Sequence, residues 1–233
     1  LRARRMLKTV SSGVLSTGET VTDNAAWAAL DVLIGDAANP RPIDSTKVDL
    51  AAFESFAARA LACNLYVDFR SNVQDLVNTI VAPSFGSLGY NGKWTVVEDR
   101  DGLSPVQLIG PRNSKFLGGV ERYDDLPHAI RVKFIDEDRE YQEWEHIVYD
   151  DGYNADGSDG LVAATKFESA ELRGITKNGA SPENYVHRHF RVRMAMARLR
   201  RSEWHEEMFL DHMRCKRGDV VNYQHWAALI GQT

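Results

Sequence analysis

The hydrophobic pattern changes its period along the chain, and this change most limits the possible folds. In the first hundred residues, apolar side chains mostly recur every three or four positions, which is the period of a helix. From about Pro105 they mostly form short runs or alternate with polar residues, which is typical of strands. Because the two patterns are segregated, we expect an α+β fold with mixed helices and antiparallel strands rather than a doubly wound α/β sheet.

Three helices are expected in the N-terminal part. Asn24 is a suitable N-cap for a helix that Gly35 ends, and Asp49 is a suitable N-cap for a second helix. Ser71, with Gln three residues later, fits a capping box that opens a third helix. The apolar faces of the second and third helices are Leu50, Phe53, Phe56, Ala57, Ala60 and Leu61, and then Val73, Leu76, Val77, Ile80 and Val81.

The remaining N-terminal segments predict loops and strands. Ser11 to Asp23 is rich in Ser, Thr and Gly and predicts a loop. Asn64 to Arg70 alternates apolar and polar residues and predicts a half-buried strand. Asn91-Gly92 predicts a two-residue type I′ hairpin turn, followed by a strand from Lys93 to Glu98.

The middle of the chain predicts a series of strands with charged connections. Asp136 to Asp138 has the composition of a hairpin tip, and Asp150 to Gly160 that of a polar loop. The expected strands are Val106–Ile109, Ala129–Ile135, Trp144–Tyr149 and Phe167–Leu172.

The longest helix is expected near the C-terminus. Ser181-Pro182-Glu183 combines an N-cap, a proline at the first helical position and an acid at the positive end of the helix dipole. The helix is expected to run to about Ser202. A C-terminal hairpin should follow, with strands near 206–214 and 220–224 joined across Arg217-Gly218-Asp219. One possible packing face of the helix is Tyr185, His189, Val192, Met196 and Leu199.

These elements suggest two regions. Residues 1–100 form a helix-rich region with a strand hairpin, and residues 101–233 form a β-rich region with the long helix at about 182–202 and the C-terminal hairpin. Leu1 to Val10 resembles the end of a strand, which favours a fragment of a longer polypeptide.

Composition excludes several classes. With 43% hydrophobic and 26% charged residues, the chain is of ordinary globular composition. Its net charge of −5 disfavours a general nucleic-acid binder. Cys63 and Cys215 form no disulfide framework, which favours a reducing compartment of synthesis. We see no apolar run long enough to span a bilayer and no signal peptide.

The acidic loop from Asp150 to Gly160 is the best candidate for a metal site. Ca²⁺ needs six or more oxygen ligands, which a flexible acidic loop can supply. However, Gly152 stands where an EF-hand needs its first Asp, and no Glu closes the loop. We therefore interpret the segment as a solvated acidic loop and assign no metal.

Motifs for catalysis are incomplete. His205-Glu206-Glu207 begins like a zinc-protease helix, but Phe209 occupies the position of the second histidine. His187 and His189 would lie about 200° apart on a helix and could not share a metal. Gly86-Ser87 is one residue off a nucleophile elbow. We expect no catalytic residue and no cofactor.

The long helix is rich in arginine, which leaves two interpretations open. The arginines could contact nucleic acid, or they could pair with acidic strands or a neighbouring subunit. At 100° per residue they spread around the helix instead of forming one stripe, which favours the pairing interpretation. They are Arg188, Arg191, Arg193, Arg198, Arg200 and Arg201.

A series of short motifs runs through nearly the whole chain. It begins with Asn24-Ala25-Ala26-Trp27 and continues with Leu30-Asp31-Val32-Leu33, where Trp27 is expected in the core. Later members are Phe53–Cys63, Asp75–Ala82, Asn91-Gly92-Lys93 with the strand to Asp99, Val132–Asp136, Leu172-Arg173-Gly174-Ile175-Thr176 with the arginine-rich helix, and Arg217-Gly218-Asp219-Val220.

The order of these motifs resembles the tail-tip attachment proteins of long-tailed bacteriophages, the lambda host-specificity (J-like) central tail-hub family. Two positions depart from the family pattern, since Ala25 and Arg217 both replace a proline. The positions that carry the resemblance are structural: Asn24, Trp27, Asp31, Leu33, Gly92, Gly174, Gly218 and Asp219.

The resemblance implies a structural virion protein without enzymatic activity. Such hubs are similar to contractile-tail baseplate hubs, with tube-like β domains and flanking helices in a homotrimer that closes the tail tube. The implied partners are the tail tube, the distal tail protein and other tail-tip proteins, with the tape measure as a further candidate. The implied location is the virion tail tip, after synthesis in the host cytoplasm.

Two other functions stay open on the residues alone. One is a hydrolase-like enzyme whose site is assembled from distant histidine and acidic residues, marked by perturbed titratable groups in a deep pocket. The other is a nucleic-acid or sugar-binding module, marked by a basic patch or an aromatic groove.

Overall fold

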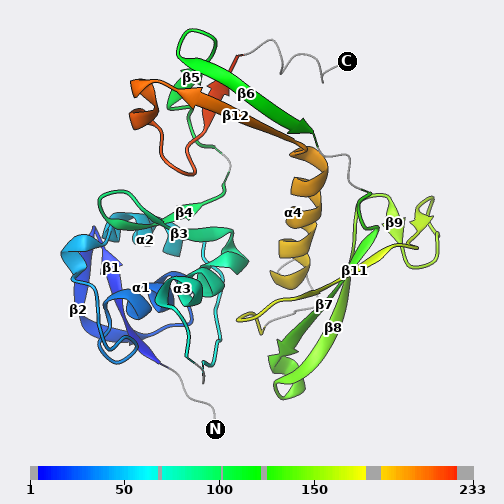
Figure 1. Cartoon of the computed structure of the whole chain (residues 1–233). Helices are drawn as coiled ribbons and strands as arrows, with labels where there is room; N and C mark the ends of the chain where they lie inside the picture. The colour runs from blue at the N-terminus through cyan, green and yellow to red at the C-terminus, as the bar shows by residue number, and fades with distance from the viewer. Residues whose placement is uncertain (1–4, 68–69, 101, 122–124, 177–184, 225–233) are drawn as a thin grey trace. The chain divides into compact units, whose positions relative to one another are not determined.

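A computed structural model describes residues 5–67, 70–100, 102–121, 125–176 and 185–224 (Figure 1). This part of the chain contains four α-helices and thirteen strands, arranged in several small antiparallel and parallel sheets. The predicted α+β class is therefore confirmed. In the described residues, no helix combines the length and the apolar character needed to cross a membrane.

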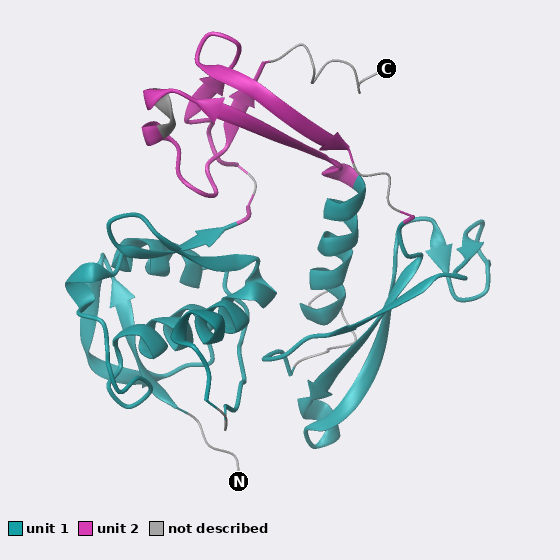
Figure 2. Cartoon of the chain, in the orientation of Figure 1, with its two compact units in different colours: residues 1–98, 126–198 teal, residues 99–125, 199–233 magenta. Residues whose placement is uncertain are grey.

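The chain forms two compact units, each built from two separate segments (Figure 2). Unit 1 comprises Leu1–Glu98 and Leu126–Arg198, and unit 2 comprises Asp99–Asp125 and Leu199–Thr233. This division differs from the two continuous regions, 1–100 and 101–233, that the sequence suggested. The reason is strand pairing over long distances, because both segments of unit 2 contribute to the same small sheets.

The N-terminal part of unit 1 packs three helices with two hairpins. Its elements are β1 (Met6–Ser11), β2 (Val14–Val21), α1 (Ala25–Ile34), α2 (Leu50–Ala57), α3 (Val73–Val81), β3 (Gly86–Tyr90) and β4 (Trp94–Glu98). Antiparallel pairing joins β1 to β2 and β3 to β4. The predicted helical faces are largely confirmed, since Phe53, Phe56, Val77, Ile80 and Val81 are all buried in one core with Leu30 and Leu33 of α1.

Asn24 explains where α1 begins. Its Oδ1 accepts from the amide of Ala26 at 2.9 Å, which caps the helix, and its Nδ2 donates to the carbonyl of Ala57 at 2.8 Å. One side chain thus caps α1 and fastens it to the end of α2. The amide of Gly35 donates to the carbonyl of Asp31 at 2.7 Å and ends the helix as predicted.

Three N-terminal predictions are wrong in their local structure. The predicted loop at 11–23 contains β2, because Ser and Thr suit an exposed strand as well as a loop. The described part of 64–70 is not a strand, because Asn64 bonds to the backbone of Gly174 instead of to a sheet. The cap of α3 is Asn72, not Ser71, since Asn72 Oδ1 accepts from Gln74 N at 3.1 Å.

The hairpin at Asn91-Gly92 forms, but its loop is longer than predicted. Tyr90 faces Trp94 in the register, so three residues connect the strands instead of two. Gly92 has φ +72°, a conformation that favours glycine.

The second part of unit 1 is a three-stranded sheet with one covering helix. The sheet has the order β11 (Phe167–Glu171), β7 (Ala129–Asp136), β8 (Gln142–Tyr149), with β8 antiparallel and β11 parallel to β7. Two short parallel strands, β9 (Tyr153–Asn154) and β10 (Val162–Ala163), lie in the loop between β8 and β11. Strand β7 strictly alternates buried and exposed residues from Ile130 onward, and its buried side chains pack on α4 (Tyr185–Leu199).

Helix α4 buries a different face from the predicted one. Val186, Phe190 and Met194 are buried, whereas Val192 and Leu199 of the predicted face are exposed. Both sets satisfy helical spacing, and arginines flank both, so the sequence did not distinguish them. The helix ends at Leu199, before Ser202, and its predicted start at 181–183 lies outside the described residues.

Unit 2 contains two pairs of strands instead of a C-terminal hairpin. β12 (Ser202–Met208) pairs antiparallel with β6 (Ser114–Glu121), and β13 (Val221–Tyr223) pairs parallel with β5 (Gln107–Ile109). The predicted hairpin between 206–214 and 220–224 is therefore wrong. The segment Leu210–Arg214 is a short 3₁₀ helix, η4.

Unit 2 also differs from unit 1 in its packing. Both clusters of buried hydrophobic side chains, around α1–α3 and around β7–α4, belong to unit 1. In the described part of unit 2, no hydrophobic side chain is buried, and ten large ones are exposed. These are Val106, Leu108, Leu117, Val120, Leu199, Trp204, Phe209, Leu210, Met213 and Val220.

Candidate functional site

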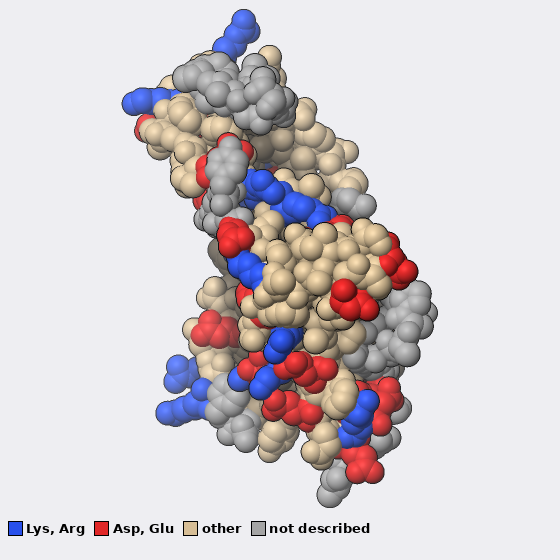
Figure 3. Space-filling model, turned by 90° about the vertical axis from the view of Figure 1, so that its right-hand side faces the viewer, with Lys and Arg blue, Asp and Glu red and all other residues tan. Residues whose placement is uncertain are grey.

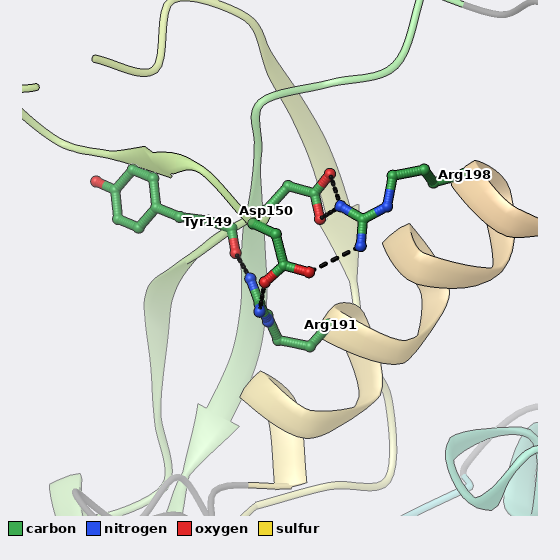
Figure 4. Close-up of polar contacts among 5 residues, drawn as sticks. Tyr149, Asp150, Arg191 and Arg198 are labelled. Carbon is green, nitrogen blue, oxygen red and sulfur yellow. Dashed lines mark hydrogen bonds and ion pairs between the residues drawn. The ribbon is translucent and has the colours of Figure 1, made fainter. Parts of the chain in front are cut away.

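Two arginines of α4 hold the loop that follows β8 (Figure 4). Arg198 Nη1 donates to both carboxylate oxygens of Asp150 at 3.1 Å, and its Nη2 donates to Asp151 Oδ2 at 2.7 Å. Arg191 Nη1 donates to the carbonyl of Tyr149 at 2.7 Å, and its Nη2 pairs with the other oxygen of Asp151. We call these five residues the arginine–aspartate clamp.

The electrostatics of the clamp favour a structural role. Hydrogen bonds from Arg198 and then Arg191 lower the pKa of Asp151 below its ordinary value, because they stabilise the ionised carboxylate. A carboxylate held in this way by two guanidinium groups is a poor proton donor. The clamp therefore fixes the helix to the sheet on which it packs, and the Asp151 carboxylate stays ionised within it.

The clamp also includes the first two acids of the predicted acidic loop. Asp150 and Asp151 direct their oxygens at arginines, and Asn154 uses its Oδ1 to accept from the amide of Gly157. Asp156 accepts from the amide of Ser158 at 3.1 Å. These oxygens stabilise turns and ion pairs. Within the described residues, no group of three or more His, Cys, Asp and Glu side chains could hold a metal ion.

Arg193 of α4, and Arg200 just after the end of this helix, also pair with acids. Arg193 Nη2 lies 3.6 Å from Glu168 on β11, and Arg200 Nη2 donates to Asp99 at 3.1 Å. On the face drawn in Figure 3, acidic and basic side chains lie beside one another instead of in separate fields of one sign. The interpretation that helix arginines pair with surrounding acids is thus confirmed for Arg191, Arg193, Arg198 and Arg200.

The two histidines on α4 contact different elements. His187 Nδ1 lies 3.5 Å from Nε2 of His146 on β8. His189 Nδ1 donates to the carbonyl of Pro83 at 2.9 Å, and its ring stacks on Phe85 at 4.7 Å. His205 lies on β12, so the zinc-protease helix does not form. Sequence reasoning missed the contact between His146 and His187, which joins a strand and a helix.

The stability of unit 1 should fall when the pH drops below about 6.5. Burial lowers the pKa of His146 and His187. An electrostatic interaction lowers each pKa further, with His187 for the first and with Arg191 for the second. Both rings are therefore neutral in the folded chain at pH 7. Because the unfolded chain binds protons more readily below pH 6.5, acidification favours unfolding until the folded pKa values are passed.

Thermal melting at pH 7.5 and pH 5.5 measures this effect. Between pH 7.5 and pH 5.5, the Tm of the double variant His146→Gln/His187→Gln should decrease less than that of wild type. The Tm of the exposed control His205→Gln should decrease as much as that of wild type. An equal pH dependence in the double variant and the wild type would contradict the assignment.

The first four residues of the resemblance lie on α1 or at its start. Asn24 is the N-cap, Leu33 is buried, and Trp27 is partly buried against the N-terminal core. Asp31 forms an ion pair with Arg5 at 2.7 Å, while burial raises the pKa of its carboxyl. These residues shape the helix and its packing.

The other four residues of the resemblance lie in turns. Gly218 has φ +92°, and Asp219 Oδ2 accepts from the amide of Lys216 at 2.8 Å. Gly92 is in the β3–β4 loop, and Gly174 follows β11. The eight positions therefore serve caps, turns and packing in several different elements, six of them in unit 1 and two, Gly218 and Asp219, in unit 2.

Gly174 joins the two parts of unit 1. Its carbonyl accepts from the amide of Asn64 at 2.8 Å, and Asn64 Nδ2 donates to Thr176 Oγ1 at 2.8 Å. A Cβ at Gly174 would lie 3.3 Å from the sulfur of Cys63. Burial raises the pKa of that thiol to about 11, so Cys63 is a protonated packing residue here.

Replacing Gly174 by alanine should reduce the free energy of unfolding by about 1–3 kcal/mol, because its φ of +84° strains any other residue. Gly152→Ala is a matched control, since Gly152 has φ +86° but nothing within 4 Å of its Cβ position. Urea unfolding of both variants separates backbone strain from the Cys63 contact. Equal losses in the two variants would show that the contact contributes nothing.

No protein-family model matches the sequence, and no curated protein matches it either.

Proposed function

We propose that this chain is a structural subunit of a phage tail tip, a central hub that assembles with copies of itself. In the virion it would close the tail tube and link it, through the distal tail protein and other tail-tip proteins, to the parts that recognise the host. Its action would be mechanical, with subunits that close a ring and shift when the tip meets the host.

The observation that carries the proposal is the exposed apolar surface of unit 2. Ten large hydrophobic side chains are exposed there, and in its described part none is buried. Small two-stranded sheets are marginally stable alone, so a unit built from them, with no hydrophobic side chain buried in its described part, is expected to gain stability from contacts with other subunits. A subunit whose surface is completed by neighbours accounts for this packing.

Two further observations agree with an assembly protein. The ordered series from Asn24 to Val220 resembles the tail-hub family over nearly the whole chain. In addition, Asp150 and Asp151 pair with arginines of α4, so these acids hold the fold together.

The mass of the full chain in solution tests the proposal. Mass photometry or sedimentation velocity should find a discrete particle of about three times the 26.2 kDa of one chain. A particle of 26.2 kDa at every concentration, above all one that hydrolyses an ester or glycoside, would contradict the hub and favour the hydrolase.

A further inference from the structure

The segment around η4 in unit 2 is both basic and apolar. Leu210 is 80% exposed and Met213 is 75% exposed. Three basic side chains follow within four residues: Arg214, Lys216 and Arg217, all exposed. We call these five residues the basic loop.

The hairpin tip between β7 and β8 in unit 1 has the opposite charge and a similar apolar content. Ile135 is 50% exposed and Tyr141 is 45% exposed. Asp138, Glu140 and Glu143 are also exposed around them. We call these five residues the acidic tip.

Two basic residues, Lys133 and Arg139, lie near the acidic tip. Arg139 lies 3.5 Å from Asp136, and its guanidinium lies 3.5 Å from the centre of the Trp144 ring. Lys133 lies 3.5 Å from Glu143, but both side chains are more than half exposed, so this ion pair contributes little. From residue 133 to residue 145, six acids face only two bases, which leaves a clear negative excess.

We propose that the basic loop of one copy docks on the acidic tip of a second copy of this chain. The basic loop carries three positive charges and the acidic tip three negative ones, each with two exposed apolar side chains. Asp211 and Asp219 in the loop segment, and Lys133 and Arg139 at the tip, reduce these opposite charges but leave a positive excess on one surface and a negative excess on the other. Complementary charge of this kind selects and orients a partner, while burial of the apolar side chains holds it.

The geometry of the assembly follows from the two surfaces being different. An interface between unlike patches is heterologous, so each copy uses one patch to contact one neighbour and the other patch to contact the next. Such contacts form a closed ring when the rotation that relates neighbouring subunits divides a full turn evenly. The inference rests on the proposed hub function, since it names the interface by which the ring would close.

Charge reversal in the full chain tests the contact. The loop variant is Arg214→Glu/Lys216→Glu/Arg217→Glu, and the tip variant is Asp138→Lys/Glu140→Lys/Glu143→Lys. Each should assemble at least tenfold more weakly than wild type by sedimentation velocity, because like charges then face one another. A chain with all six changes should recover assembly to within about threefold, since every junction is again complementary.

Three controls accompany the test. Lys93→Glu and Glu19→Lys reverse exposed charges on other elements and should leave assembly unchanged. Leu210→Ser/Met213→Ser removes the apolar part without changing charge, and should also weaken assembly by at least tenfold. Circular dichroism checks that each variant keeps its fold.

The outcomes separate the two proposals. If wild type assembles and either charge variant assembles as tightly, or the six-change chain stays as weak as its parents, the contact is wrong and the hub proposal stands. If wild type is a monomer at all concentrations, both proposals fail. Weakening in both charge variants with recovery in the six-change chain supports the contact.

Discussion

Replacing Phe190 by alanine should reduce the free energy of unfolding by about 3–5 kcal/mol, among the largest losses expected for a single substitution in this chain. Phe190 is 1% exposed and lies between α4 and the buried face of β7. Truncation removes its buried ring and leaves a cavity that the sheet cannot fill, because the clamp and the strand pairing both hold the backbone in place.

The effect should be specific to the second core of unit 1. Val192→Ala, at an exposed position of the same helix in unit 1, is the matched control and should change the unfolding free energy by no more than about 0.5 kcal/mol. Hydrogen exchange should show faster exchange along β7 and α4 in the Phe190 variant. Similar losses from Phe190→Ala and Val192→Ala would contradict the assigned face of α4.

Replacing Leu33 by alanine should reduce the free energy of unfolding by about 2–5 kcal/mol. Leu33 is a residue of the first motif and is buried in the core formed by α1, α2 and α3. Its loss would leave α1 without a main contact, because the helix is short and depends on packing more than on intrinsic propensity.

Leu161→Ala is the control for Leu33, since Leu161 lies in an exposed loop of the same unit. Chemical denaturation should separate the two variants clearly. If Leu33→Ala costs no more than the control, the first motif does not act through the core, and its part in the family resemblance needs another physical cause.

Features set by neighbouring residues were largely predictable from the sequence. Asn24 and Gly35 bound α1 as expected, because capping depends on one side chain and the nearest backbone groups. The alternation in β7 and the helical stripe of α3 were also found, since each pattern repeats over several residues.

Features set by distant residues were not predictable. β6 pairs with β12 although about ninety residues separate them, and nothing local in Ser202–Met208 indicates its partner. The choice of Phe190 over His189 as the central packing residue of α4 depends on the sheet below, because both positions satisfy the helical period.

The sequence predicted some features of the candidate surfaces but not others. Pairing of helix arginines with surrounding acids was expected from their spread around α4, and the structure identifies Asp150, Asp151, Glu168 and Asp99 as the acids. The sequence also predicted a charged hairpin tip at Asp136 to Asp138, within the region of the acidic tip. The exposed apolar side chains of unit 2 were not, because composition alone does not reveal which hydrophobic residues lack a core.

Electron microscopy of the assembled full chain, at a resolution that places side chains, is the decisive test of assembly through unit 2. We predict a closed ring in which the apolar side chains of unit 2 are buried between copies, with Leu210 and Met213 against a neighbour. A single chain whose unit 2 side chains all face solvent, or a ring that leaves them exposed, would contradict the account.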